Sequence, residues 1–72
     1  MIDLEKTLPG HLVRCIPSSP GVAREVFERN LDRGAIVDEV YMVSRLEVSS
    51  SYSSVYLLGM KESFNPLGFD NI

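Results

Sequence analysis

Residues 35–60 have the sequence AIVDEVYMVSRLEVSSSYSSVYLLGM, which predicts two strands joined by a loop. Residues 35–48 are rich in Val, Ile, Tyr and Met, and the alternation of their side chains is typical of β-structure. We expect one long, bent strand or two shorter strands in this stretch. Asp38-Glu39 marks the expected bend or turn.

A serine-rich segment at residues 49–54 has no means of making a packed core and predicts a hairpin loop. Residues 55–60 then predict the returning strand. The following residues, 61–66, predict a polar turn that carries Phe64. The last six residues, 67–72, predict a short strand or a helical turn.

A further strand is expected before this hairpin, at residues 11–16, where an apolar run is ended by Pro17. Residues 1–8 are compatible with a short helix capped by Asp3 or with an extended arm. The sequence does not separate these two alternatives.

An amphipathic helix is expected over about residues 20–31. Ser19 is the expected N-cap, with Pro20 in the first turn, where its missing N–H matters least. Asn30 and Gly34 bracket the expected end of the helix, because both tolerate positive φ. The apolar face comprises Val22, Ala23, Val26, Phe27 and Leu31, and the polar face carries the i,i+4 pairs Arg24/Glu28 and Glu25/Arg29.

These elements predict a single domain over residues 1–72, of α+β or mostly β class. The expected architecture is a small curled antiparallel sheet or partly open barrel that carries one helix. A chain of 72 residues has a marginal core, and Cys15 is its only cysteine, so no internal disulfide reinforces it. We therefore favour a homodimer.

Spaced apolar and glycine positions carry a resemblance to a known family. They are Val13-Arg14-Cys15-Ile16, Leu31-Asp32-Arg33-Gly34, Val40-Tyr41-Met42-Val43, Val55-Tyr56-Leu57 and Gly68-Phe69. In this pattern the chain resembles small SH3-like barrel proteins of phage and bacterial origin and unknown role. The resemblance implies a partly open SH3-like barrel and a binding role, and it departs from the family where residues 20–31 look helical.

The charge of the chain argues against several partners. Ten acidic residues against seven Lys and Arg give a formal net charge of −3, which disfavours nucleic acid and anionic membranes. The chain opens without the features of a secretory signal and has no apolar run long enough to cross a membrane. With a free thiol, this predicts a bacterial or infected-host cytoplasm.

No residue set predicts catalysis, a cofactor or a metal. His11 and Cys15 fall on one face of the expected strand, but they lie too far apart for a direct hydrogen bond. One His and one Cys do not complete a tetrahedral metal site. Asp38-Glu39 and Asp70 are interpreted as solvated carboxylates. We expect a protein that is not an enzyme.

The aromatic residues of the C-terminal half are the more useful signal. Tyr52 and Phe64 fall in polar segments, where exposed aromatic side chains often anchor binding. With Tyr56, Arg45 and Lys61 they form the predicted partner-binding surface.

Three functions follow from these observations. The first is a small protein-binding module, such as an accessory or inhibitory protein of a phage or mobile element. The second is a nucleic-acid-binding SH3-like module, in which Arg14, Arg33, Arg45 and Lys61 come together beside Tyr52 or Phe64. The third is a subunit of a homo-oligomer that pairs through the helix face or a sheet edge.

Overall fold

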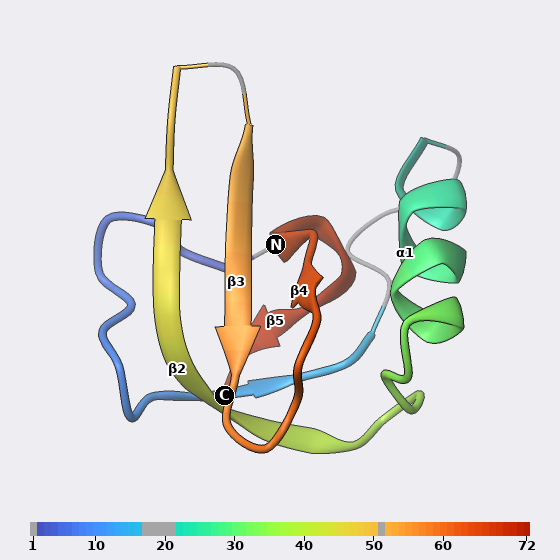
Figure 1. Cartoon of the computed structure of the whole chain (residues 1–72), viewed down its shortest axis with the longest axis horizontal. Helices are drawn as coiled ribbons and strands as arrows, with labels where there is room; N and C mark the ends of the chain where they lie inside the picture. The colour runs from blue at the N-terminus through green and yellow to red at the C-terminus, as the bar shows by residue number, and fades with distance from the viewer. Residues whose placement is uncertain (1, 17–21, 51) are drawn as a thin grey trace.

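The computed structural model describes residues 2–16, 22–50 and 52–72. It is a curled sheet with one helix beside it (Figure 1). The elements are β1 (Leu12–Arg14), α1 (Val22–Asp32), β2 (Val40–Val48), β3 (Ser53–Leu57), β4 (Ser63–Phe64), the 3-10 helix η1 (Pro66–Gly68) and β5 (Asp70–Asn71).

The five strands form one antiparallel sheet in the order β4-β3-β2-β1-β5. The long strand β2 belongs to both halves of this sheet: its start pairs with β1, and its remainder pairs with β3. An irregularity between Val43 and Arg45 separates the two registers. Since a bulge bends the strand that contains it, β2 turns the corner of the sheet. The expected small antiparallel sheet with one helix is confirmed, and the sheet is not closed.

The two edges of the sheet are joined by a short piece of chain. β4 lies at one edge and β5 at the other, and only Asn65, η1 and Phe69 separate them in sequence. The expected C-terminal element is therefore both a helical turn and a short strand. Because so few residues span the distance, the sheet must curl around its core.

Apolar side chains from both halves of the sheet fill the space inside the curl. The rings of Phe64 and Phe69 meet edge to face with centroids 5.8 Å apart, and Tyr41 meets Phe69 in the same way at 6.3 Å. Phe64 and Phe69 are fully buried, whereas Tyr41 is partly buried. The other fully buried apolar residues include Ile2, Val13, Cys15, Val43, Val55 and Leu57.

The helix has the expected polar face. Ion pairs join Arg24 to Glu28 at 3.4 Å and Arg29 to Glu25 at 3.6 Å, both exposed. The expected cap at Ser19 and Pro20 lies outside the described residues. The helix ends at Asp32, between Asn30 and Gly34 as predicted, but Asn30 does not adopt positive φ; it lies within α1 and is buried. Gly34 does end the segment, with φ of 111°.

Several predicted boundaries shift. Residues 36–39 form a turn rather than strand, with Asp38 at φ 67°, as expected for a turn at Asp38-Glu39. Residues 2–8 contain a single turn, in which the Asp3 carboxylate accepts hydrogen bonds from the backbone N–H groups of Glu5 and Lys6. Phe64 was predicted in a polar turn, which is wrong: it lies in β4 and is 1% exposed.

Candidate functional site

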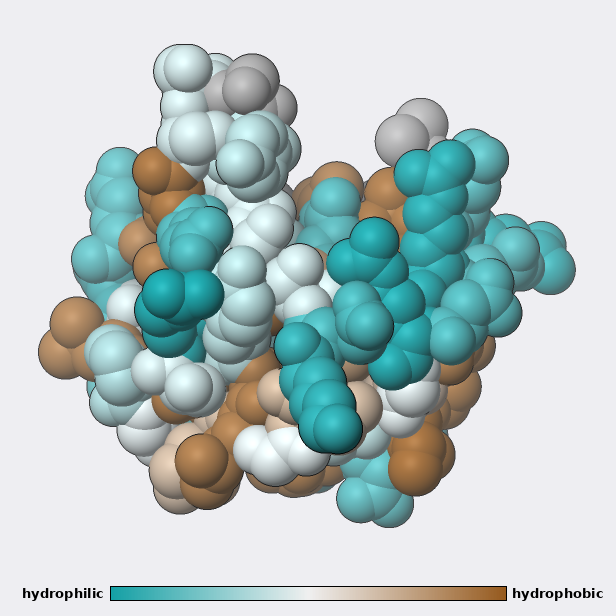
Figure 2. All heavy atoms as spheres, in the orientation of Figure 1, coloured by the Kyte–Doolittle hydropathy of each residue, from teal (hydrophilic) through white to brown (hydrophobic). Residues whose placement is uncertain are grey.

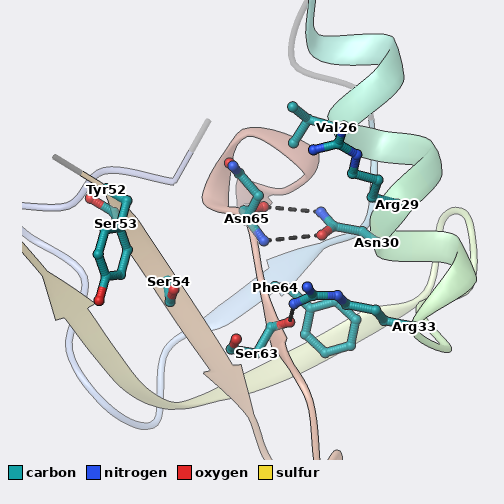
Figure 3. Close-up of a pocket in the computed structure, with 10 residues that line it drawn as sticks. All are labelled: Val26, Arg29, Asn30, Arg33, Tyr52, Ser53, Ser54, Ser63, Phe64 and Asn65. Carbon is teal, nitrogen blue, oxygen red and sulfur yellow. Dashed lines mark hydrogen bonds between the residues drawn. The ribbon is translucent and has the colours of Figure 1, made fainter.

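A groove separates α1 from the β2–β3 hairpin. Figure 2 shows the surface hollowed between these two elements, and a pocket of about 220 Å³ occupies the hollow. One wall comprises Val26, Arg29, Asn30 and Arg33 of α1 and the turn after it, the opposite wall comprises Tyr52, Ser53 and Ser54, and Ser63, Phe64 and Asn65 form the base (Figure 3).

The base of the groove is held to the helix by Asn30. The Asn30 Nδ2 donates to the Asn65 carbonyl oxygen at 3.0 Å, and the Asn65 N–H donates to Asn30 Oδ1 at 3.0 Å (Figure 3). Because the N–H and the C=O of Asn65 both bond to the Asn30 side chain of the helix, Asn65 does not extend β4 alongside β3. The ladder between β3 and β4 therefore covers only Val55 and Tyr56.

This early end of β4 leaves an edge of β3 facing the groove. Tyr52 directs its backbone groups toward β2: its carbonyl oxygen accepts from the Ser49 N–H at 2.9 Å, and its N–H donates to Ser49 Oγ at 3.1 Å. Successive residues of a strand direct these groups to opposite sides. Ser53 therefore directs its N–H and C=O toward the groove, where no described residue pairs with it.

Positive charge lines the helix side of the groove. Arg29 and Arg33 both line it, and none of the described residues around the pocket is acidic. Arg33 donates from its guanidinium to the Ser63 carbonyl oxygen at 2.7 Å, which fixes the side chain across the base. A chain of net charge −3 thus presents two guanidinium groups and three serine hydroxyls in one groove.

The predicted partner-binding residues do not all share this site. Tyr52 stands at the groove and is 65% exposed. The Arg45 guanidinium lies 4.2 Å from the Tyr56 ring centroid and pairs with Glu47 at 2.9 Å, on the hairpin. Lys61 is exposed in the bend after β3. Phe64 reaches the base of the groove, but its burial leaves almost no ring surface for a partner.

The basic residues expected in a nucleic-acid site are spread out. Arg33 lines the groove beside α1, whereas Arg14 lines a separate pocket with Asp70 and Ile72. Arg45 is engaged with Glu47. The described basic side chains therefore form no single cluster.

The pair His11 and Cys15 has no arrangement for nucleophilic chemistry. Cys15 is fully buried, and burial, with a smaller contribution from the Asp38 carboxylate, raises the pKa of its thiol to about 11. The reactive thiolate is therefore scarce at neutral pH. The Nδ1 atom of His11 accepts a hydrogen bond from the Leu8 N–H at 3.2 Å, so this side chain holds the turn that precedes β1.

No helix in the described ranges is long and apolar enough to cross a bilayer. Within the same ranges, His, Cys, Asp and Glu form no group of three or more that is arranged to hold a metal ion.

Comparison with protein-family models, with curated protein sequences and with solved structures returned no match to this chain. The site is therefore interpreted from its own geometry. Sequence reasoning missed Arg29, Asn30 and Ser53 as site residues, because no local pattern relates a helix to a strand more than 20 positions away. Arg33 was named only in the nucleic-acid hypothesis.

Proposed function

We propose that this chain is a small, non-enzymatic protein-binding module whose groove takes an extended acidic segment of a partner protein. The observation that carries the proposal is the position of Ser53. Its strand edge opens into a groove whose opposite wall bears Arg29 and Arg33. A segment lying along that edge gains backbone hydrogen bonds from Ser53, as in strand addition.

The size and charge of the groove favour this occupant. A volume of about 220 Å³ is below the range of pockets that enclose a drug-sized ligand, and the groove is open on one side, so it suits a few residues of an extended chain. Carboxylate side chains of the segment would accept charge-assisted hydrogen bonds from the two guanidinium groups. Tyr52 offers an exposed aromatic surface at the rim.

The proposed architecture is an SH3-like, partly open barrel. Several features support it: Gly34 precedes β2, a loop-linked hairpin follows, and Gly68-Phe69 lead into the closing strand β5. The order β4-β3-β2-β1-β5, with a 3-10 helix between the two edge strands, is also in keeping with such a barrel. The helix α1 stands where the resemblance implies a long loop.

The test is a fluorescence-anisotropy titration with an octapeptide of alternating Glu and Val, against a Lys-Val octapeptide. We expect the acidic peptide to bind at least about tenfold more tightly. Arg29→Glu should weaken its binding by about tenfold, or about 1.4 kcal/mol. The matched control is Arg24→Glu, which breaks an equivalent ion pair of α1 outside the groove.

Equal binding of the two peptides, or equal effects of the two arginine variants, would contradict the proposal that the groove binds an acidic segment. Titration with single-stranded oligothymidylate distinguishes nucleic-acid binding from peptide binding. It is done at low salt, where phosphate contacts are strongest. The nucleic-acid alternative would be favoured if the natural protein bound the oligonucleotide but not the peptide, and if Arg29→Glu abolished the binding of the oligonucleotide.

A further inference from the structure

The two arginines of the groove lie one helical turn apart. The Arg33 N–H donates to the Arg29 carbonyl oxygen at 3.2 Å, so the helical hydrogen-bond pattern continues to Arg33 although α1 ends at Asp32. Residues four apart in a helix lie on one face and are separated by about 6 Å along its axis. Figure 3 shows both side chains extending from this face toward the strand side of the groove. The helix wall therefore presents two guanidinium groups in a line.

The open edge of β3 follows the same direction as this line of arginines. In Figure 1, α1 and β3 both run from the upper to the lower side of the molecule. The N–H and C=O of Ser53 face the groove from the wall opposite to Arg29 and Arg33. A segment that pairs with the edge of β3 therefore lies lengthwise between the two walls, with its backbone against Ser53 and its side chains within reach of both arginines.

Two residues of an extended chain cover nearly the same length as one turn of helix. A strand rises about 3.4 Å per residue, so residues i and i+2 share one face at a separation of about 6.8 Å, close to the spacing of the arginines. Residues i and i+1 point to opposite faces. Residues i and i+4 share a face but lie about 13.6 Å apart. Only the i,i+2 spacing places two side chains of one face opposite the two arginines.

We infer that the groove selects a partner segment in which two acidic residues are separated by one residue, so that one carboxylate meets Arg29 and the other meets Arg33. This specificity rests on the proposed function, the binding of an extended acidic segment, and names the pattern that the segment carries. Each pair is a charge-assisted hydrogen bond, and two such pairs at a fixed spacing discriminate between segments of equal charge.

Both arginines can receive a carboxylate. Arg33 uses Nη1 to donate to the Ser63 carbonyl oxygen at 2.7 Å, which is one of the five N–H donors of a guanidinium group. Arg29 pairs with Glu25 at 3.6 Å, and the two side chains are 72% and 78% exposed. Because exposed ion pairs on a helix contribute little free energy, a carboxylate of the segment can replace Glu25 as the partner of Arg29.

Three isomeric octapeptides test the inference by fluorescence anisotropy. Each contains two glutamates, three valines and three threonines, and the glutamates lie one, two or four positions apart. Composition and net charge are equal, so only the spacing differs. We expect the i,i+2 isomer to bind at least about fivefold more tightly than either of the others, because each of those leaves one arginine without a carboxylate.

Arg29→Gln should abolish this preference, since a single remaining arginine does not distinguish one spacing from another. The matched control is Arg24→Gln, which removes the same charge from the same helix but outside the groove, and which should keep the preference. Both arginine side chains are exposed, so we expect both variants to fold, and circular dichroism checks this.

Equal binding of the three isomers would overturn the inferred spacing while leaving the proposed acidic groove in place. A preference for the i,i+2 isomer that survives in Arg29→Gln would also overturn the inference, because the arginine pair would not be its cause. Binding of none of the isomers would overturn both the inferred spacing and the proposed function.

Discussion

Asn30 and Asn65 make the pair of hydrogen bonds that two neighbouring strands would make, although Asn30 lies in a helix. The side-chain amide of Asn30 donates from Nδ2 to the Asn65 carbonyl oxygen and accepts at Oδ1 from the Asn65 N–H, both at 3.0 Å. This pair ends β4 and positions the helix that forms one wall of the groove. It also satisfies a side chain that is only 2% exposed.

Replacing Asn30 should destabilise the protein. Asn30→Ala leaves the Asn65 N–H without its partner and removes one of the two hydrogen bonds to the Asn65 carbonyl oxygen, which still accepts from the Gly68 N–H. We expect this to cost about 2 kcal/mol of the free energy of unfolding. For a chain of this length, that corresponds to a melting temperature lower by roughly 8–16 °C. Urea and thermal unfolding measure the change. Glu28→Ala, on the exposed face of the same helix, should change the free energy by less than about 0.5 kcal/mol; similar losses in both variants would contradict the role given to Asn30.

Gly68 should be coupled energetically to Asn30. A Cβ at Gly68 would clash with the Asn30 side-chain amide, while the backbone of Gly68 itself is not in the positive-φ region. Gly68→Ala should therefore cost about 1–3 kcal/mol in the natural sequence. In the Asn30→Ala background the cost should be smaller by at least about 0.5 kcal/mol. Strict additivity in this double-mutant cycle would show that the two residues do not interact.

The buried thiol of Cys15 should make stability fall in alkaline solution. Burial raises the pKa of Cys15 from 9.0 to about 11, so between these values the unfolded chain loses a proton that the folded chain keeps. The unfolded state is favoured there by about 1.4 kcal/mol for each pH unit. The slope should be half as steep at pH 9, where half of the unfolded thiols have lost their proton, and should vanish below about pH 8. Urea unfolding of the natural protein and Cys15→Ala between pH 8 and 11 measures the difference; parallel curves would contradict the expectation.

Tyr52 should contribute to binding and not to stability. Tyr52 is among the residues that line the groove, and 65% of its surface is exposed, so Tyr52→Ala removes little buried area. We expect the Glu-Val octapeptide to bind roughly threefold to tenfold more weakly to this variant, a loss of about 1 kcal/mol. The free energy of unfolding should stay within about 0.5 kcal/mol of its original value. Unchanged peptide binding would exclude Tyr52 from the site.

Local patterns predict much of this fold. The helix follows from its i,i+4 charge pairs and from the helical spacing of its apolar residues, Val22, Ala23, Val26, Phe27 and Leu31. The hairpin follows from a serine segment between β-branched runs. Phe64 was misplaced because β4 contains only two residues, too few for an alternating pattern. The shift of register between Val43 and Arg45 likewise breaks the alternation that indicates which side chains face the core.

The groove could not be predicted from local sequence patterns. It depends on hydrogen bonds between residues 30 and 35 positions apart, Arg33 with Ser63 and Asn30 with Asn65. An asparagine near the end of a predicted helix is ordinarily assigned to the cap, because its side chain competes for backbone hydrogen bonds there. Here the curl of the sheet brings a strand end within reach of that side chain. Only the assembled structure reveals the pairing.

Amide chemical-shift mapping with the Glu-Val octapeptide tests the binding groove most directly. We expect the largest shifts on Ser53, Arg29, Arg33 and Asn65, and we expect them to shrink at high salt, where charge attraction is screened. The Lys-Val octapeptide should leave these amides unchanged. No shift at saturating peptide, or shifts centred on Leu12, Met42 and Leu58 instead, would contradict the assignment of the groove as the binding site.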